Sequence, residues 1–154
     1  MSTITIGQPI PAFTAESTQG TIDSTALKGQ AYVLYFYPRD NTPGCTTQAQ
    51  NFRDQLPEFE KLSVKIIGVS RDSMGSHERF ATKQELPFAL ISDPDEALCE
   101  LFGVMKMKNM YGKQVRGIER STFLVNADGV LVQEWRGLRV PGHVDQVLEA
   151  ARQL

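Results

Sequence analysis

The chain has only two cysteines among its 154 residues, Cys45 and Cys99. Two cysteines this far apart provide neither the disulfide framework of a small secreted protein nor the closely spaced ligands of a zinc site. The start of the chain also lacks a basic segment followed by an apolar one, so no signal peptide is expected. A free thiol stays reduced in the cytoplasm, and we therefore expect a cytoplasmic protein.

Long hydrophobic runs and an excess of basic residues are missing too. The longest apolar stretch, residues 31–38, is far too short to span a bilayer. The formal net charge is −2, so the chain has no basic excess to neutralise the phosphates of a nucleic acid or of an anionic membrane. No nucleic-acid or membrane partner is expected. Because repeats, linkers and low-complexity segments are also missing, residues 1–154 are predicted to form a single domain.

The middle of the chain alternates between strand patterns and helix patterns. Residues 31–37 are almost entirely apolar and aromatic, which is typical of a strand buried on both faces. Residues 64–70 and 88–91 have a similar pattern. Helical patterns separate the three segments, and this order predicts a parallel sheet covered by helices.

The last third of the chain predicts antiparallel pairing. Two strand-like runs flank Asp128 and Gly129, which is a strong hairpin signal, and an amphipathic helix follows Pro141. The stretch that ends at Gly29 is expected to add a strand or a hairpin. Together these elements predict an α/β domain with a thioredoxin-like fold, in which helices flank a central mixed β-sheet with an N-terminal β extension.

Cys45 follows the first buried strand and lies at the start of a helix. A helix N-terminus carries partial positive charge and unpaired N–H groups, and both favour the reactive thiolate. Cys45 lies four residues before Ala49 on the apolar stripe of the helix, so its sulfur is expected to point inward. Pro57 cannot donate a helical hydrogen bond, and the helix is expected to kink or break near Leu56.

The residues before Cys45 argue for chemistry. A free cysteine is most often a small buried hydrophobe, and Cys45 taken alone fits that description. However, Pro43 and Gly44 let the backbone approach another group closely, and Thr42 places a hydroxyl three positions before the thiol. An inert cysteine needs neither feature.

These residues resemble the active site of the peroxiredoxins. Pro38, Thr42 and Cys45 match the signature Pro-x-x-x-Thr-x-x-Cys, and residues 35–46 are similar to the bacterioferritin comigratory protein branch, also called the Q-type peroxiredoxins. The similarity covers nearly the whole chain. It continues in residues 68–70, 92–94, 102–104 and 117–123.

The resemblance implies a thiol-dependent peroxidase of antioxidant defence that reduces hydrogen peroxide and organic hydroperoxides without a metal or an organic cofactor. The Cys45 thiolate would attack one peroxide oxygen and become a sulfenic acid. By the family pattern, Thr42 offers its hydroxyl to the peroxide and Arg120 donates to both thiolate and peroxide. Pro38 would shield the sulfenate. From its position alone, Arg120 would be an ordinary surface arginine.

The chain departs from the family pattern at two positions. Gln50 stands where many Q-type members carry a resolving cysteine, and Gln48 stands where the family often has glutamate. Cys99 is predicted to be a semi-buried packing residue on a short helix over residues 94–103, capped by Asp93. We therefore expect a one-cysteine cycle completed by an external thiol such as thioredoxin, glutaredoxin or glutathione. A monomer or a weak homodimer would suit the family.

Three rival functions stay open. A thiol–disulfide exchanger on the same fold would need Cys-x-x-Cys, and Gln48 occupies the second position. A cysteine hydrolase would pair Cys45 with His143, which is expected to begin the last helix away from the sulfur. A binding module would keep Cys45 buried and inert.

Other side chains give weaker signals. His77 is predicted to be a packed structural histidine, and Trp135 a core residue of the C-terminal hairpin. Residues 105–113 are basic and rich in methionine. They are predicted to form a solvated loop, with a docking surface for an acidic reductant as the alternative.

Overall fold

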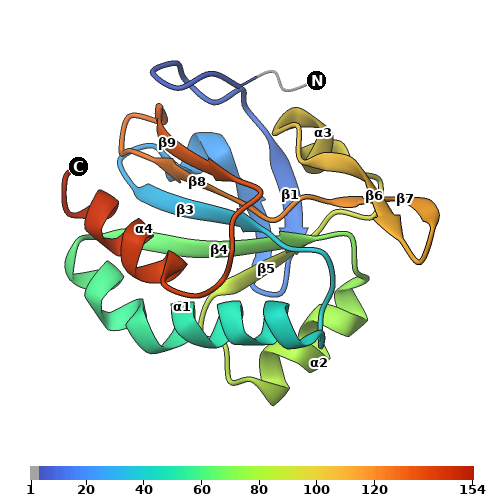
Figure 1. Cartoon of the computed structure of the whole chain (residues 1–154). Coiled ribbons are helices and arrows are strands. Elements are labelled where there is room, and N and C mark those ends of the chain that lie inside the picture. Colours follow the sequence, from blue (N-terminus) through green and yellow to red (C-terminus); the bar gives the residue numbers. More distant parts are fainter. Residues whose placement is uncertain (1–3) are drawn as a thin grey trace.

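The computed structural model describes residues 4–154, apart from the side chain of Met110. These residues form a seven-stranded mixed sheet and a separate two-stranded sheet (Figure 1). The strand order in the large sheet is β2-β1-β5-β4-β3-β8-β9. Its strands are β1 (Thr14–Ser17), β2 (Gly20–Asp23), β3 (Ala31–Phe36), β4 (Val64–Ser70), β5 (Ala89–Ser92), β8 (Ser121–Val125) and β9 (Leu131–Arg136). Residues 1–3 of the predicted domain lie outside the described part.

The pairing of the strands confirms the predicted mixed sheet. β3 pairs with β4, and β4 with β5, in parallel register. β8 runs antiparallel to β3 and forms the predicted hairpin with β9 around the turn at Asp128 and Gly129. β1 and β2 form an antiparallel hairpin that joins the sheet through β5, and this is the predicted N-terminal extension.

Helices cover both faces of the sheet and enclose two separate cores. The helices are α1 (Pro43–Lys61), α2 (Met74–Lys83), α3 (Ala97–Leu101), α4 (His143–Ala151) and a 3-10 helix, η1 (Ser24–Leu27). The first core lies under α1, α2 and α4, and the second contains side chains of α3 (Figure 1). β3 contributes to both: Val33 and Tyr35 belong to the first core, Leu34 and Phe36 to the second. None of the helices within residues 4–154 is long and apolar enough to cross a membrane.

Two predictions about helices are wrong. α1 does not break near Leu56 but runs on to Lys61 with Pro57 inside it. Phe52 and Phe59 on either side of the proline are fully buried, and their packing holds the helix together despite the missing N–H donor.

The helix that carries Cys99 is also shorter than predicted. It begins at Ala97 because Glu96 has a left-handed backbone conformation (φ 63°) that cannot belong to a regular helix. Asp93 still caps it, since its carboxylate accepts hydrogen bonds from the amides of Leu98 (3.1 Å) and Cys99 (2.9 Å).

Residues 105–113 are not a solvated loop. They form β6 (Met105–Met110) and enter β7 (Lys113–Ile118), and the two strands pair as an antiparallel hairpin apart from the large sheet. Tyr111 and Gly112 connect the strands with positive φ angles of 55° and 80°. Two residues with positive φ make the tight turn that suits the twist of a hairpin. A tyrosine in this position gives no turn signal, so the sequence pattern did not reveal the hairpin.

Candidate active site

Cys45 lies in the first turn of α1, immediately behind the loop that leaves β3. Thr42 is the N-cap residue with an extended backbone, and Pro43 is the first helical residue, where its missing N–H costs nothing. Amides of this first turn have no partner inside the helix and point toward its mouth. The side chain of Cys45 faces the first core together with Ala49, and only 2% of the residue is exposed. Its sulfur therefore points inward, as the spacing predicts.

Arg120 brings a positive charge to this sulfur from the opposite side of the site. It immediately precedes β8, the antiparallel neighbour of β3. Its Nη2 donates a hydrogen bond to Sγ of Cys45 (3.4 Å), while Nη1 donates to Oε1 of Gln48 (2.6 Å). Two residues that are 75 positions apart in the sequence thus meet at the helix mouth. A guanidinium in contact with the sulfur stabilises its thiolate form.

Gly44 makes this close approach possible. A Cβ atom on Gly44 would lie 3.2 Å from Nη2 of Arg120, so that a larger residue would push the guanidinium aside. The glycine is therefore explained by the space that Arg120 occupies.

Gln48 holds the second branch of the guanidinium. The side chain is fully buried one turn after Cys45 on α1, and its Nε2 has no hydrogen-bond partner within residues 4–154. A glutamate here would form a charged pair with Arg120, whereas the neutral amide fixes the guanidinium and leaves its positive charge for the thiolate. Glutamine in place of the usual glutamate thus has a physical role, which is to hold Arg120 without neutralising its charge.

Thr42 and Pro38 lie on the loop that approaches the helix mouth. The Thr42 hydroxyl donates to the carbonyl oxygen of Arg39 (2.9 Å), so its own oxygen remains able to accept a hydrogen bond. Pro38 is half-buried and directly follows the buried Tyr37. The structure thus places both residues on the segment that leads into Cys45, and the Thr42 hydroxyl is directed to Arg39 and not to the sulfur.

A buried polar cluster supports this loop, and the sequence did not predict it. Asp40 accepts hydrogen bonds from the Tyr37 hydroxyl (2.6 Å) and the Ser76 hydroxyl (2.8 Å), and it lies 2.7 Å from Nδ1 of His77. Nε2 of His77 lies 2.8 Å from the carbonyl oxygen of Ile91 and must carry a hydrogen, since a carbonyl only accepts. Burial tends to raise the pKa of Asp40, but the hydrogen bonds from His77 and Tyr37 outweigh it and the net pKa is lowered.

This cluster connects three parts of the fold. Its aspartate follows β3, its histidine lies on α2, and the carbonyl belongs to β5. His77 is fully buried, which agrees with the predicted structural role. The Asp72 carboxylate lies close enough to Asp40 and His77 for the three side chains to share a cation. However, Asp72 already accepts hydrogen bonds from the Asp40 amide and the Ser70 hydroxyl. Both oxygens of Asp40, both ring nitrogens of His77 and Oδ2 of Asp72 thus already take part in internal hydrogen bonds.

His143 lies near the site without touching the sulfur. Its Nε2 is 2.8 Å from the hydroxyl of Thr122, and no hydrogen bond joins it to Cys45 in the described part of the chain. Burial and, to a smaller extent, the positive charge of Arg120 lower the pKa of His143 to about 4. A neutral imidazole bonded to Thr122 is not the partner that a cysteine hydrolase requires.

Cys99 is on the other side of the sheet. Cys45 belongs to the core under α1, whereas Cys99 belongs to the core on the α3 face. Cys99 is fully buried in this core, which agrees with the predicted packing role, although the residue is more deeply buried than predicted. Burial raises the pKa of its thiol, and the neighbouring Asp93 carboxylate raises it further. Both effects keep Cys99 in the unreactive thiol form.

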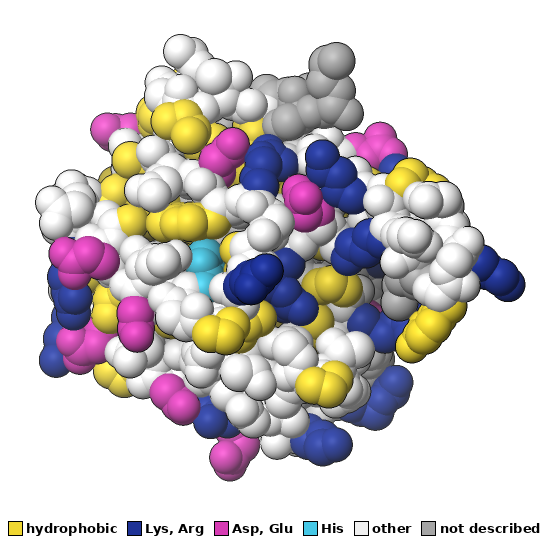
Figure 2. Space-filling model, viewed as in Figure 1, with side chains coloured by type: hydrophobic (Ala, Val, Ile, Leu, Met, Phe, Trp, Pro, Cys, Tyr) yellow, Lys and Arg dark blue, Asp and Glu magenta, His cyan; other side chains and the backbone are white. Residues whose placement is uncertain are grey.

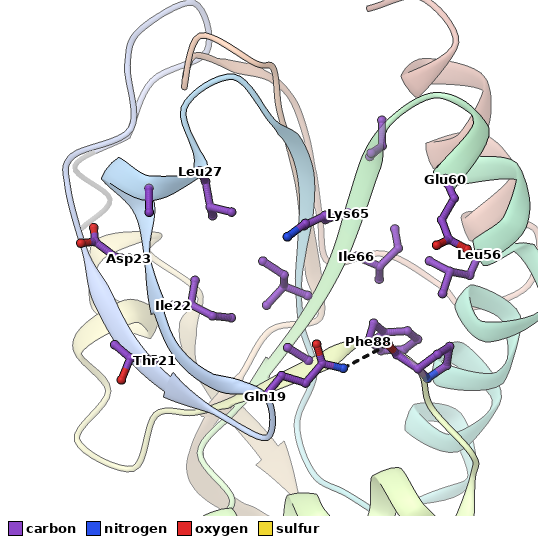
Figure 3. Close-up of a pocket in the computed structure, with 15 residues that line it drawn as sticks. Gln19, Thr21, Ile22, Asp23, Leu27, Leu56, Glu60, Lys65, Ile66 and Phe88 are labelled. Atoms are coloured by element: carbon purple, nitrogen blue, oxygen red, sulfur yellow. Dashed lines mark hydrogen bonds between the residues drawn. The ribbon is translucent and has the colours of Figure 1, made fainter.

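A hollow of about 440 Å³ lies elsewhere on the molecule (Figure 3). It is enclosed by the β1–β2 turn and η1 on one side and by β4 and the end of α1 on the other. Gln19 closes one end by donating a hydrogen bond to the carbonyl oxygen of Pro87 (3.0 Å). None of the residues around Cys45 lines it, so it is not part of the thiol site.

The sequence matches a known family over most of its length. Residues 6–134 match the model of the AhpC/TSA family. Peroxiredoxin Bcp of Xanthomonas campestris is 54% identical over 143 residues, which cover 93% of this chain and 88% of that protein. Peroxiredoxin Bcp of Bacillus subtilis is 45% identical over 153 residues, covering 99% of this chain and 98% of that protein.

Solved structures of similar proteins have the same fold. A structure of the Xanthomonas campestris bacterioferritin comigratory protein, described in relation to its alkyl peroxide reduction activity, has a TM-score of 0.90 at 49% identity and covers 97% of this chain and 98% of that one. A cysteine-to-serine mutant of Xylella fastidiosa PrxQ has a TM-score of 0.92 at 40% identity, with 99% and 98% coverage. The fold is therefore the thioredoxin fold of these proteins, and the chain belongs to the AhpC/TSA family as a Bcp-type (Q-type) peroxiredoxin, a thiol-dependent peroxidase.

Proposed function

We propose that Cys45 is the peroxidatic cysteine and that it reduces hydrogen peroxide and organic hydroperoxides. The observation that carries this assignment is the Arg120 guanidinium, which contacts Sγ of Cys45 at the mouth of α1 and is fixed there by Gln48. The thiolate attacks one peroxide oxygen, so that an S–O bond forms and the O–O bond breaks. The leaving oxygen takes up a proton and departs as water or an alcohol, and Cys45 remains as a sulfenic acid.

The surrounding groups match the charge that develops in this reaction. Negative charge spreads from sulfur over both oxygens, and Arg120 and the first-turn amides of α1 are fixed donors for it. A hydroperoxide also carries one O–H group, and the Thr42 oxygen can accept from it because its own hydrogen is directed to Arg39. Pro38 is assigned the role of keeping water away from the sulfenate.

The arrangement of the cysteines supports a one-cysteine cycle. Gln50, which stands at the usual resolving position, donates a hydrogen bond to Gln84, the C-cap residue of α2 (2.8 Å), and offers no thiol. Cys99 is buried in the other core, and the sheet separates it from Cys45. An external thiol therefore attacks the sulfenic acid and releases water, which leaves a mixed disulfide. A second thiol then cleaves that disulfide and restores Cys45.

Thioredoxin, glutaredoxin and glutathione are the reductant classes that we propose. Catalysis by the thiol alone would need neither a metal nor an organic cofactor. A single domain, a cytoplasmic location and a monomeric or weakly dimeric state stay predictions.

Intact-mass measurement after one equivalent of peroxide, without reductant, tests the cycle. One added oxygen on the wild-type chain and none on Cys45→Ser is the expected result. Loss of two hydrogens would indicate a Cys45–Cys99 disulfide, and a doubled mass would indicate a disulfide between two chains. Either result would replace the one-cysteine cycle, and an unreacted wild-type chain would refute the peroxidase assignment.

A further inference from the structure

The hairpin β6–β7 has one face that is rich in lysine. Side chains alternate along paired strands, and the register places Lys106 opposite Gly117 and Lys108 opposite Val115 on the same face. Lys113, at the start of β7, also belongs to this face by its register. We call these five residues the lysine face.

The opposite face of the hairpin is fixed to the body of the protein. Arg116 lies on that face and forms salt bridges with Glu96, the N-cap residue of α3, and with Glu100 of α3. Met105 and Ile118, also on that face, pack in the second core. The hairpin is therefore attached to the protein through the opposite face, and the lysine face points away from that attachment.

The lysine face has little negative charge beside it: Glu119, just after β7, acts on Lys108 without forming a salt bridge. No salt bridge within residues 4–154 involves Lys106, Lys108 or Lys113, and residues 101–118 contain no acidic residue. This is a local asymmetry, since the whole chain has a net charge of −2. Figure 2 shows Lys and Arg side chains gathered from the centre of one surface of the molecule toward the hairpin on its right.

The base of this face leads to Arg120, the residue that contacts Cys45. Nζ of Lys108 lies 3.7 Å from the place of a Cβ on Gly117, so its side chain extends back along the hairpin toward the segment that leads to Arg120. Lys108 is half-buried, whereas Lys106 is exposed. Burial lowers the pKa of Lys108 and the Arg120 charge lowers it further, whereas a Cys45 thiolate and the Glu119 carboxylate act in the opposite direction.

We propose that the lysine face is the docking surface for an acidic protein that supplies the reducing thiol to oxidised Cys45. This inference rests on the proposed function, which requires an external reductant. Lysines that form no salt bridge of their own attract a partner with acidic residues around its reactive thiol and accelerate the encounter. Val115 is 41% exposed on the same face and offers an apolar contact between the lysines.

The size of the face favours a protein over a small thiol. Lys106 and Lys113 are separated by four residue steps along the hairpin, which is about 14 Å. An extended tripeptide spans only about 10 Å, so glutathione cannot engage both ends. Transient redox encounters between proteins bury small interfaces, and a hairpin face is of suitable size.

Charge reversal tests the docking surface with reduced thioredoxin as the probe. The double variant Lys106→Glu/Lys113→Glu changes two exposed side chains that do not belong to the peroxide site. Lys28→Glu/Lys83→Glu is the matched control, since it makes the same charge change at exposed positions outside the hairpin. Cys45 is first oxidised with one equivalent of peroxide, and its reduction by thioredoxin, by glutathione or by uncharged dithiothreitol is then followed in separate experiments.

The hairpin variant is expected to be reduced by thioredoxin at least about tenfold more slowly than the control, with a weaker dependence on ionic strength. Its rates with peroxide and with dithiothreitol should equal those of the control. Equal thioredoxin rates in both variants would overturn the docking proposal, as would an equal slowing with glutathione or a change in oligomeric state that accounts for the effect. Failure of peroxide to oxidise Cys45 would instead refute the proposed function.

Discussion

Arg120→Lys is the substitution that most directly tests the geometry at the helix mouth. The guanidinium makes two hydrogen bonds at once, 2.6 Å to Gln48 and 3.4 Å to Cys45, and has further N–H groups for the peroxide. A lysine keeps the positive charge but presents a single ammonium group, which cannot bond Gln48 and cover the sulfur and the peroxide in the same fixed geometry. The variant therefore separates the contribution of the positive charge from that of the two-pronged hydrogen-bonding geometry.

The expected loss follows from the number of hydrogen bonds removed. One charge-assisted hydrogen bond contributes about 1.5–3 kcal/mol. If lysine retains the charge and loses one such bond to the transition state, the second-order rate of Cys45 oxidation should fall about 10- to 150-fold. Arg120→Ala should lose more, because the charge is removed as well.

Single-turnover oxidation by hydrogen peroxide, quenched and analysed by mass, gives this rate without interference from the reductant. Arg53→Lys is a matched control on α1, because Arg53 is also partly buried and donates to the Gln84 carbonyl oxygen (2.8 Å). It should oxidise at the wild-type rate. A rate for Arg120→Lys within threefold of wild type would show that the bidentate geometry does not contribute to the peroxide step.

Three further substitutions give separate expectations. Cys99→Ser should leave both single-turnover oxidation of Cys45 and steady-state turnover unchanged, because the sheet separates the two residues; normal oxidation with a loss of turnover would make Cys99 the resolving residue. Gly44→Ala should slow oxidation about tenfold, since the new methyl group would lie 3.2 Å from Nη2 of Arg120; a wild-type rate would show that the guanidinium yields at no cost. Asp40→Asn should lower the free energy of unfolding at pH 7 by about 3 kcal/mol. Because the folded pKa of Asp40 is below its ordinary value of 3.8, its contribution to stability is present above that pH and is lost as the pH falls through the folded pKa. Urea titrations from pH 7 to pH 3 should therefore show a shallower loss of stability in Asp40→Asn, and parallel curves would contradict the buried pair.

Much of the fold could be predicted because it depends on local patterns. The alternation of buried strands and amphipathic helices gave the parallel centre of the sheet, and Asp128-Gly129 gave the C-terminal hairpin. The hairpin β6–β7 was missed for a physical reason. Its strands have alternating lysine and methionine rather than β-branched residues, and its turn uses a tyrosine at positive φ. The helix break expected at Pro57 is also absent from α1, because the packing of Phe52 and Phe59 outweighs the local cost of the proline.

The site was predicted only in part, since family resemblance named Pro38, Thr42, Cys45 and Arg120 but not what holds them. The contact of Arg120 with Gln48 and the pair of Asp40 with His77 join residues that are 72 and 37 positions apart. No periodicity or motif in a single sequence encodes such pairs, because they exist only after the sheet has aligned its strands. In the sequence, Gln48 is only the loss of a charge. Its role in holding Arg120 follows from the hydrogen bond between the two side chains (2.6 Å).

The burial of Cys45 places different demands on oxidation and reduction. A small peroxide can reach a sulfur beside Arg120, but a protein thiol must approach to disulfide-bond length, about 2.05 Å. With 2% of Cys45 exposed, the first turn of α1 has to move outward before a protein can make that bond. The Thr46 amide to Thr42 carbonyl bond (2.9 Å) is one of the contacts that hold this turn closed. We therefore expect a partner held at the lysine face to be in place when the turn opens. Docking would then raise the rate of reduction and leave the rate of oxidation unchanged, which is why the two half-reactions have to be measured separately.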